Sequence, residues 1–175
     1  MQVARRRRFV VCSFYVVAIA AVVACGSPVV ADEPGPMTPA RFHQRAGAAL
    51  EAMLREAGER KMQGVAIIAF VPGERTVAWV SQMQAVDSIV VGQANVLAIA
   101  SCKLAEMADT LQDSGSKARP PLHGENGYRG GAIRKVAGGY LLAAFSGGKD
   151  TDDLDVANLG LDALEKQPTE AAVGR

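Results

Sequence analysis

The chain has 175 residues, which is room for one domain and too little for two of ordinary size, since domains usually run about 100 to 150 residues. Four of its 19 basic residues and none of its 18 acidic ones precede residue 32, so the remainder carries 15 basic against 18 acidic residues. Because that remainder is weakly acidic and its Lys and Arg are scattered, we expect no nucleic-acid partner.

The first 31 residues have the pattern of an export signal. Arg5 to Arg8 form a basic cluster, and the sixteen residues from Phe9 to Ala24 are almost continuously apolar. That run is shorter than the roughly 20 apolar residues a membrane-spanning helix needs. We therefore predict an export signal over residues 1–31 and a domain that is secreted, periplasmic or part of the cell envelope.

Two processing routes fit this segment. "VVAC", ending at Cys25, resembles a bacterial lipobox, in which the Cys receives a lipid and becomes the new N-terminus. The alternative is cleavage after Ala31 in "PVVA", where small residues suit ordinary signal peptidase. Membrane contact is expected only through a lipid on Cys25. Since Cys12 and Cys25 both precede the domain, Cys102 is its only thiol and it can form no internal disulfide.

Structure is expected to begin after a flexible tether. Residues 26–37 are rich in Pro and Gly and have no periodicity, whereas Thr38 and Pro39 are a typical N-cap and first helical residue. Apolar residues then recur at helical spacing as far as about Gly58, which predicts an amphipathic helix. We assign residues 38–166 to a single domain.

The middle of the chain predicts a β-hairpin, a helix and a long loop. The β-branched run Gly64 to Val71 and the segment Thr76 to Gln82 are separated by four residues that include Pro72 and Gly73, so both are expected to be strands. A nearly all-apolar helix is predicted from Asp87 or Ser88 to about Leu111, buried in the domain or in a subunit interface. Residues 112–131 hold most of the turn formers and are expected to be irregular.

A second hairpin and a last helix complete the domain. Strands are predicted over 132–136 and 140–145, and a helix from about Asp152 to Lys166, followed by a disordered tail at 167–175. Hairpins make a sheet antiparallel, and three amphipathic helices can cover its faces. The fold class is therefore α/β of the α+β kind.

Two stretches resemble a known family. They are "SQMQAVDSIVVGQANVLAIA" and "GGYLLAAFSGGKDTDDLDVANLGLDAL", and with the first hairpin "GVAIIAFVPGERTVAWVSQM" they resemble the GlcG-like and HbpS-like haem-binding, or haem-degrading, domain proteins over about residues 45–165. The resemblance implies a profilin-like α-β-α sandwich with an antiparallel sheet and a homo-oligomeric state. It also implies haem or a related tetrapyrrole as ligand, with roles in haem degradation or in signalling through a membrane sensor partner.

Haem needs an axial donor in an apolar cleft, and the sequence offers few. His43 lies in the first turns of the first helix and is expected to be exposed and structural. His123 lies in the Gly- and Pro-rich loop near Tyr128 and Arg129, so a donor, an aromatic face and a propionate partner could meet there, although a loop histidine without a role is the commoner case. We take as candidate ligand-binding residues His123, Tyr128, Arg129, Ser146, Gly147 and Gly148.

Other residues have simpler explanations. Cys102, Trp79 and Met83 are expected to be buried core side chains. The acidic cluster around Asp150 to Asp155 lacks the Gly and Glu that a calcium-binding EF-hand loop requires, and acids in a first helical turn complement the helix dipole. We therefore predict no metal site and no catalytic residues, since no Ser-His-Asp, paired-carboxylate or Cys-x-x-Cys set can be assembled.

The first hypothesis is thus an exported haem- or tetrapyrrole-binding protein for capture, buffering or sensing. One alternative is an enzyme of haem breakdown or small-acid metabolism, which the family name suggests and these residues do not support. Another is a cell-surface interaction module that binds no small ligand.

Overall fold

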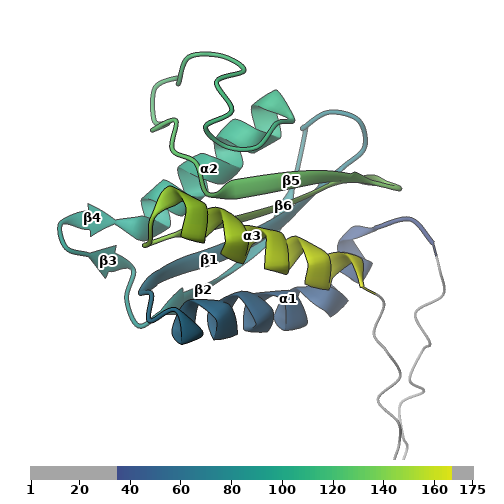
Figure 1. Cartoon of the computed structure of the whole chain (residues 1–175). Helices are drawn as coiled ribbons and strands as arrows, with labels where there is room; N and C mark the ends of the chain where they lie inside the picture. The colour runs from purple at the N-terminus through teal and green to yellow at the C-terminus, as the bar shows by residue number, and fades with distance from the viewer. Residues whose placement is uncertain (1–34, 167–175) are drawn as a thin grey trace, which may run out of the picture. The chain divides into compact units, whose positions relative to one another are not determined.

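The computed structural model describes residues 35–166 (Figure 1). The predicted export signal at 1–31 with Cys25, the tether as far as residue 34 and the tail at 167–175 lie outside this range. The elements in chain order are α1 (Pro39–Glu59), β1 (Gly64–Pro72), β2 (Val80–Val86), β3 (Val90–Val91), β4 (Ala94–Asn95), α2 (Val96–Thr110), β5 (Gly131–Val136), β6 (Gly139–Ser146) and α3 (Asp150–Glu165).

The main sheet has four strands in the order β2-β1-β6-β5, and all neighbours are antiparallel. The central pair is β1 with β6, in a register that runs from Val65 opposite Ser146 to Pro72 opposite Gly139. Residues 64–71 are all buried, as expected of a central strand that is covered on both faces. The strands β3 and β4 form a separate two-stranded ribbon.

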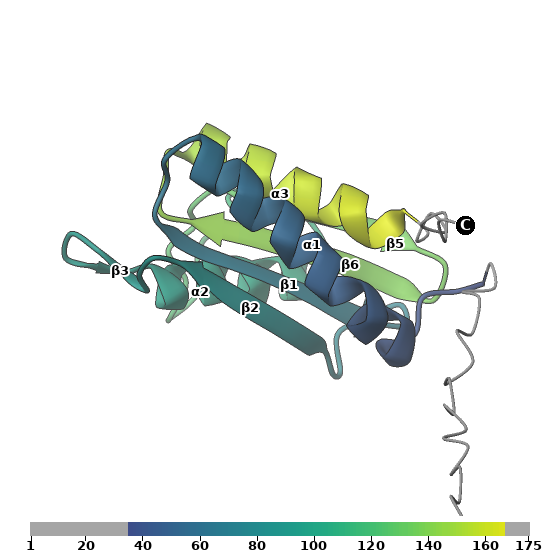
Figure 2. The ribbon, with the colours of Figure 1, turned by 90° about the horizontal axis from the view of Figure 1, so that it is seen from below.

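Helices cover both faces of the sheet. Figure 2 shows α1 and α3 side by side on one face, with α2 on the other. Ala66, Ile68 and Phe70 of β1 pack with α1 and α3, while alternate residues such as Val65 and Ile67 pack with α2. This α-β-α sandwich confirms the predicted fold class. Within residues 35–166, no helix combines the length and apolar character needed to span a bilayer.

The first helix begins as predicted. Thr38 is its N-cap, and the Thr38 side chain accepts a hydrogen bond from Arg41 N at 3.2 Å. Met37, which the sequence assigns to the tether, is instead buried, and its N–H donates to Ala137 O at 2.7 Å. The packed part of the chain therefore includes at least one residue before the N-cap.

The prediction of a helix from Asp87 or Ser88 is wrong. Residues 90–95 form the β3–β4 ribbon, which turns at Gly92 with φ +60°, and α2 begins only at Val96. The reason is local: the Asn95 side chain accepts a hydrogen bond from Ala98 N at 3.0 Å and caps the helix there. Strand β2 likewise begins at Val80, four residues later than predicted.

Trp79 and Met83 are also not core residues, because 41% and 39% of their surfaces are exposed. Strand β2 is an edge strand, and α2 packs mainly over β6 and β1. Met83, on the α2 side of β2, is therefore left uncovered, whereas Ala85 on the same side still packs with the α2 cluster.

The α1–α3 contact gives a test of packing. A Cβ added at Gly160 would lie 2.5 Å from Met53 Sδ, whereas one at Gly47, inside α1, would meet nothing within 4 Å. We expect Gly160→Ala to lower the free energy of unfolding by about 1–2 kcal/mol through overpacking. Gly47→Ala should raise it by about 0.5–1 kcal/mol through helix propensity. Urea unfolding of both variants measures the difference, and equal effects would contradict this packing.

Candidate functional site

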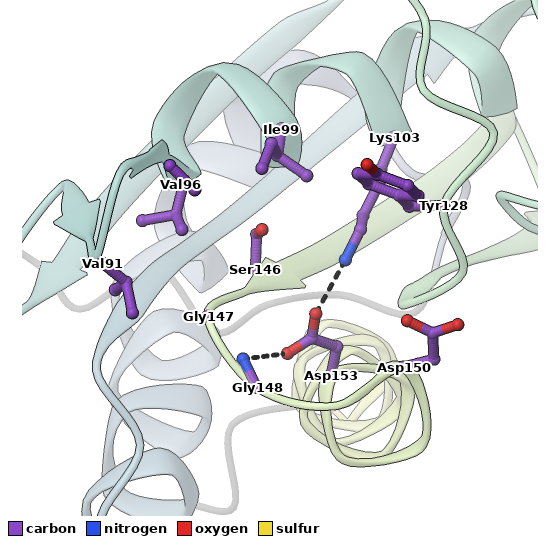
Figure 3. Close-up of a pocket in the computed structure, with 11 residues that line it drawn as sticks. Val91, Val96, Ile99, Lys103, Tyr128, Ser146, Gly147, Gly148, Asp150 and Asp153 are labelled. Carbon is purple, nitrogen blue, oxygen red and sulfur yellow. Dashed lines mark hydrogen bonds and ion pairs between the residues drawn. The ribbon is translucent and has the colours of Figure 1, made fainter.

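A cleft of about 260 Å³ lies at the end of the sheet where β6 leads into α3 (Figure 3). One side comes from the β3–β4 ribbon and the start of α2, and the other from the segment between β6 and α3. The lining residues are Val91, Ala94, Val96, Ile99, Lys103, Tyr128, Ser146, Gly147, Gly148, Asp150 and Asp153.

The Ser-Gly-Gly segment forms the lower edge of the cleft, where the end of β6 and the start of β1 approach each other closely. Gly147 has φ +149°, and a Cβ at this position would overlap Gln63 O. Gly64 makes the reciprocal approach, since its own Cβ would overlap Ser146 O. Only glycine fits both constraints, so the end of β6 and the start of β1 fix the position of Ser146.

A buried ion pair lies at the base of the cleft. Lys103 Nζ is 2.8 Å from Asp153 Oδ2 and donates to Phe145 O at 2.6 Å. The two side chains are only 3% and 5% exposed. Lys103 belongs to α2, Phe145 to β6 and Asp153 to α3, so a single ammonium group joins three elements from both faces of the sheet.

The environment of Asp153 fixes its neighbours as well. Asp153 Oδ1 accepts a hydrogen bond from Gly148 N at 2.9 Å, which holds the turn before α3. Burial raises the pKa of the Asp153 carboxyl above its ordinary value, although the Lys103 charge and the hydrogen bonds from Lys103 and Gly148 oppose that shift. Gly130 closes the site from the loop side, because a Cβ there would lie 2.6 Å from Lys103 Nζ.

Ser146 is the unusual polar residue of the cleft. It is 3% exposed, yet no residue of the range 35–166 forms a hydrogen bond with its hydroxyl group. Ser114, which is equally buried, accepts a bond from Gly131 N at 2.9 Å. In Figure 3 the Ser146 hydroxyl points into the cleft toward α2. No fully buried side-chain N or O atom of this range lacks a partner, so the Ser146 hydroxyl reaches the surface of the cleft and is available to a ligand or to water.

The remaining lining separates into an apolar wall and a polar rim. Val91, Ala94, Val96 and Ile99 form the wall. Tyr128 and Asp150 are exposed at the rim. The cleft therefore offers an apolar surface beside hydrogen-bonding groups, which is the usual composition of a small-molecule site.

The long loop is ordered by one arginine. Arg119 makes two hydrogen bonds to Glu125, at 2.6 and 2.8 Å, and pairs with Asp109 at the end of α2 at 2.7 Å. Glu125 also accepts from Leu122 N, and these bonds lower the pKa of Glu125 to about 2. The Cys102 thiol donates to Gly124 O at 2.7 Å. These contacts fix the segment that carries Tyr128 to the cleft.

Four of the six predicted ligand-binding residues meet in this cleft: Tyr128, Ser146, Gly147 and Gly148. His123 is exposed on the loop and does not line it. Arg129 lines a separate hollow with Lys117. His43 lies 3.0 Å from Gln82 Nε2 through its Nδ1, and Cys102 is half-buried rather than fully buried.

Sequence reasoning missed the importance of Lys103 and Asp153. Lys103 lies seven residues after Val96 and four after Ile99, so the helical period places it on the same face as these apolar residues. A lysine on such a face signals a buried partner. The other acids of the cluster have ordinary roles, since Asp152 and Asp155 pair with Arg60 at 3.3 and 3.0 Å.

The chain was compared with protein-family models, curated proteins and solved structures, and none of them matches it.

The ion pair predicts a non-additive effect of mutation. Lys103→Met leaves Asp153 buried without its partner and should lower the free energy of unfolding by about 3–5 kcal/mol. The double variant Lys103→Met, Asp153→Asn removes both charges and keeps an acceptor for Gly148 N, so it should be more stable than the single variant. Urea unfolding of both proteins tests this, and a double variant less stable than the single one would contradict it.

The loop predicts a dependence on acid pH. Because the folded pKa of Glu125 is about 2 against 4.5 for the free side chain, the ion pair stabilises the loop fully above pH 4.5 and loses this effect as the pH falls toward 2. An NMR titration should show the Glu125 carboxyl changing protonation near pH 2. At neutral pH, Glu125→Gln should speed amide exchange in residues 119–128. For the unchanged protein, a Glu125 titration midpoint near pH 4.5 would contradict the lowered pKa.

Proposed function

We propose that the protein is an exported ligand-binding protein that holds haem or a related tetrapyrrole at this cleft, for capture, buffering or sensing. The observation that carries the proposal is the apolar wall of Val91, Val96 and Ile99, which lines the same cleft as the Ser146 hydroxyl, with Tyr128 at the mouth. A macrocycle needs apolar surface for its ring and polar groups for its acidic arms, and this cleft supplies both.

The size of the cleft favours partial insertion. Its volume of about 260 Å³ is below the roughly 300–1,000 Å³ of sites that enclose drug-sized ligands. One edge of a tetrapyrrole therefore enters, and the rest lies over the rim. The rim beside Val91 is apolar, since Ile89 and Val90 are both exposed. Such a site suits transfer or sensing better than permanent storage of a cofactor.

Tyr128 is the residue that would hold the iron. Of the side-chain types that commonly ligate haem iron, the lining includes neither histidine nor methionine nor cysteine, and one tyrosine. A Tyr phenolate is an established haem ligand, and the Tyr128 ring is half-exposed at the mouth of the cleft.

An enzymatic role has less support. A catalytic nucleophile needs a base within hydrogen-bond reach, and the Lys103 ammonium is already bonded to Asp153 and Phe145. The lining contains no histidine to activate Ser146.

Haemin titration of the purified full-length protein tests the function. We expect a saturable shift of the Soret band. Tyr128→Phe should weaken binding about tenfold or more and change the spectrum, because it removes the oxygen ligand. Tyr140→Phe, at the far end of β6, and His123→Ala should leave the spectrum unchanged. Absence of a saturable shift would refute the tetrapyrrole proposal, and an effect of His123→Ala alone would move the ligand to that residue.

A further inference from the structure

We infer that the floor of the cleft is a carboxylate-binding site, in which Lys103 Nζ and Ser146 Oγ hold one carboxylate group of a ligand whose small apolar body lies against Val91, Val96 and Ile99. The inference rests on the proposed use of this cleft for ligand binding. It names the chemical group that the site recognises, and that group could belong to a tetrapyrrole propionate or to a free short-chain monocarboxylic acid.

The first support is the Ser146 hydroxyl. Several hydroxyl groups of the range 35–166 bond to the protein, as Thr76 Oγ1 does to Ala108 O at 2.5 Å and Ser101 Oγ to Leu97 O at 2.8 Å. Ser146 has no such partner in this range, and its hydroxyl reaches the surface of the cleft, because no fully buried side-chain N or O atom there lacks a partner. A ligand acceptor at this point would therefore replace water and break no hydrogen bond within the fold.

The second support is the unused donor of Lys103. An ammonium group has three N–H bonds, and the described residues accept two of them, through Phe145 O and Asp153 Oδ2. Lys103 lines the same cleft as Ser146, and in Figure 3 both side chains border the space below Ile99. A charged N–H and a neutral O–H that line one cleft are donors of the kind that the two oxygens of a carboxylate accept.

The third support is the division of the cleft lining into polar donors and an aliphatic wall. Beyond the two donors, the wall is aliphatic and the volume admits only a short body. The charge balance limits the ligand to a single carboxylate here. Asp153 neutralises Lys103, and Asp150 at the rim would repel a second carboxylate. Asp150 is the first residue of α3, and the partial positive charge at the N-terminus of this helix offsets part of that repulsion.

The probe is sodium 3-methylbutanoate, with 3-methylbutanamide as its neutral counterpart, titrated into the full-length protein and followed by amide NMR. We expect saturable shifts at Ser146, Gly147 and Gly148 with the acid, and at least fivefold weaker binding of the amide. Ser146→Ala should weaken binding of the acid about tenfold while leaving the unfolding midpoint unchanged, because the hydroxyl has no bond within the fold.

Two variants serve as matched controls. Ser101→Ala removes an exposed hydroxyl of α2 that does not line the cleft, and it should change nothing. Asp150→Asn removes the like charge at the rim and should strengthen binding of the acid about twofold to threefold at low salt, without strengthening that of the amide. Equal binding of acid and amide, or equal binding by Ser146→Ala and the unchanged protein, would overturn the inference, as would an absence of shifts in the cleft.

Haemin and its dimethyl ester separate this inference from the proposed function. If both bind equally and Ser146→Ala has no effect, tetrapyrrole binding stands and the carboxylate site is wrong. If 3-methylbutanoate binds at Ser146 while haemin gives no Soret shift, the carboxylate site stands and the tetrapyrrole proposal is wrong. If haemin binds through the site, its ester should bind at least fivefold more weakly.

Discussion

The contact between Lys103 and Asp153 is the interaction on which the rest of the site depends. It connects α2 on one face of the sheet with α3 on the other, around the end of β6, and it is almost fully removed from water. A buried pair of this kind adds little net stability compared with apolar residues, because desolvation offsets the attraction. Its effect is positional: if either helix moved along the sheet, a buried charge would be left without its partner.

Glycines occupy the close contacts at this end of the sheet. Gly130 leaves room for the ion pair, and Gly147 lets the chain after β6 lie against the residue that precedes β1. The 111–130 loop can therefore lie close to the sheet and bring Tyr128 to the cleft, held by Arg119 and its acidic partners. The polar floor, the close backbone contacts and the ordered loop are consequences of one arrangement, in which charge fixes the helices and glycine lets the backbones approach.

Much of this fold could be predicted from the sequence, because α1, β1, β6 and α3 each have a clear period and clear ends. The β3–β4 ribbon could not, since its apolar residues continue without a break into α2 and only the Asn95 cap separates them. The break after Ser146 indicated part of the cleft. The ion pair could not be predicted from the sequence, because fifty residues separate Lys103 from Asp153 and only the packed fold brings them together. His123 was suggested by its loop, but the loop directs Tyr128 to the site instead.

The wall of the cleft has a different origin from its floor. Val91 and Ala94 belong to the β3–β4 ribbon, which does not pair with the main sheet, whereas Ser146 and Asp153 are held by the central strands and helices. Substitutions in the ribbon can thus alter the shape of the cleft without weakening the scaffold. The shape of the cleft and the integrity of the fold are thus encoded in separate parts of the chain, so one can change while the other is kept.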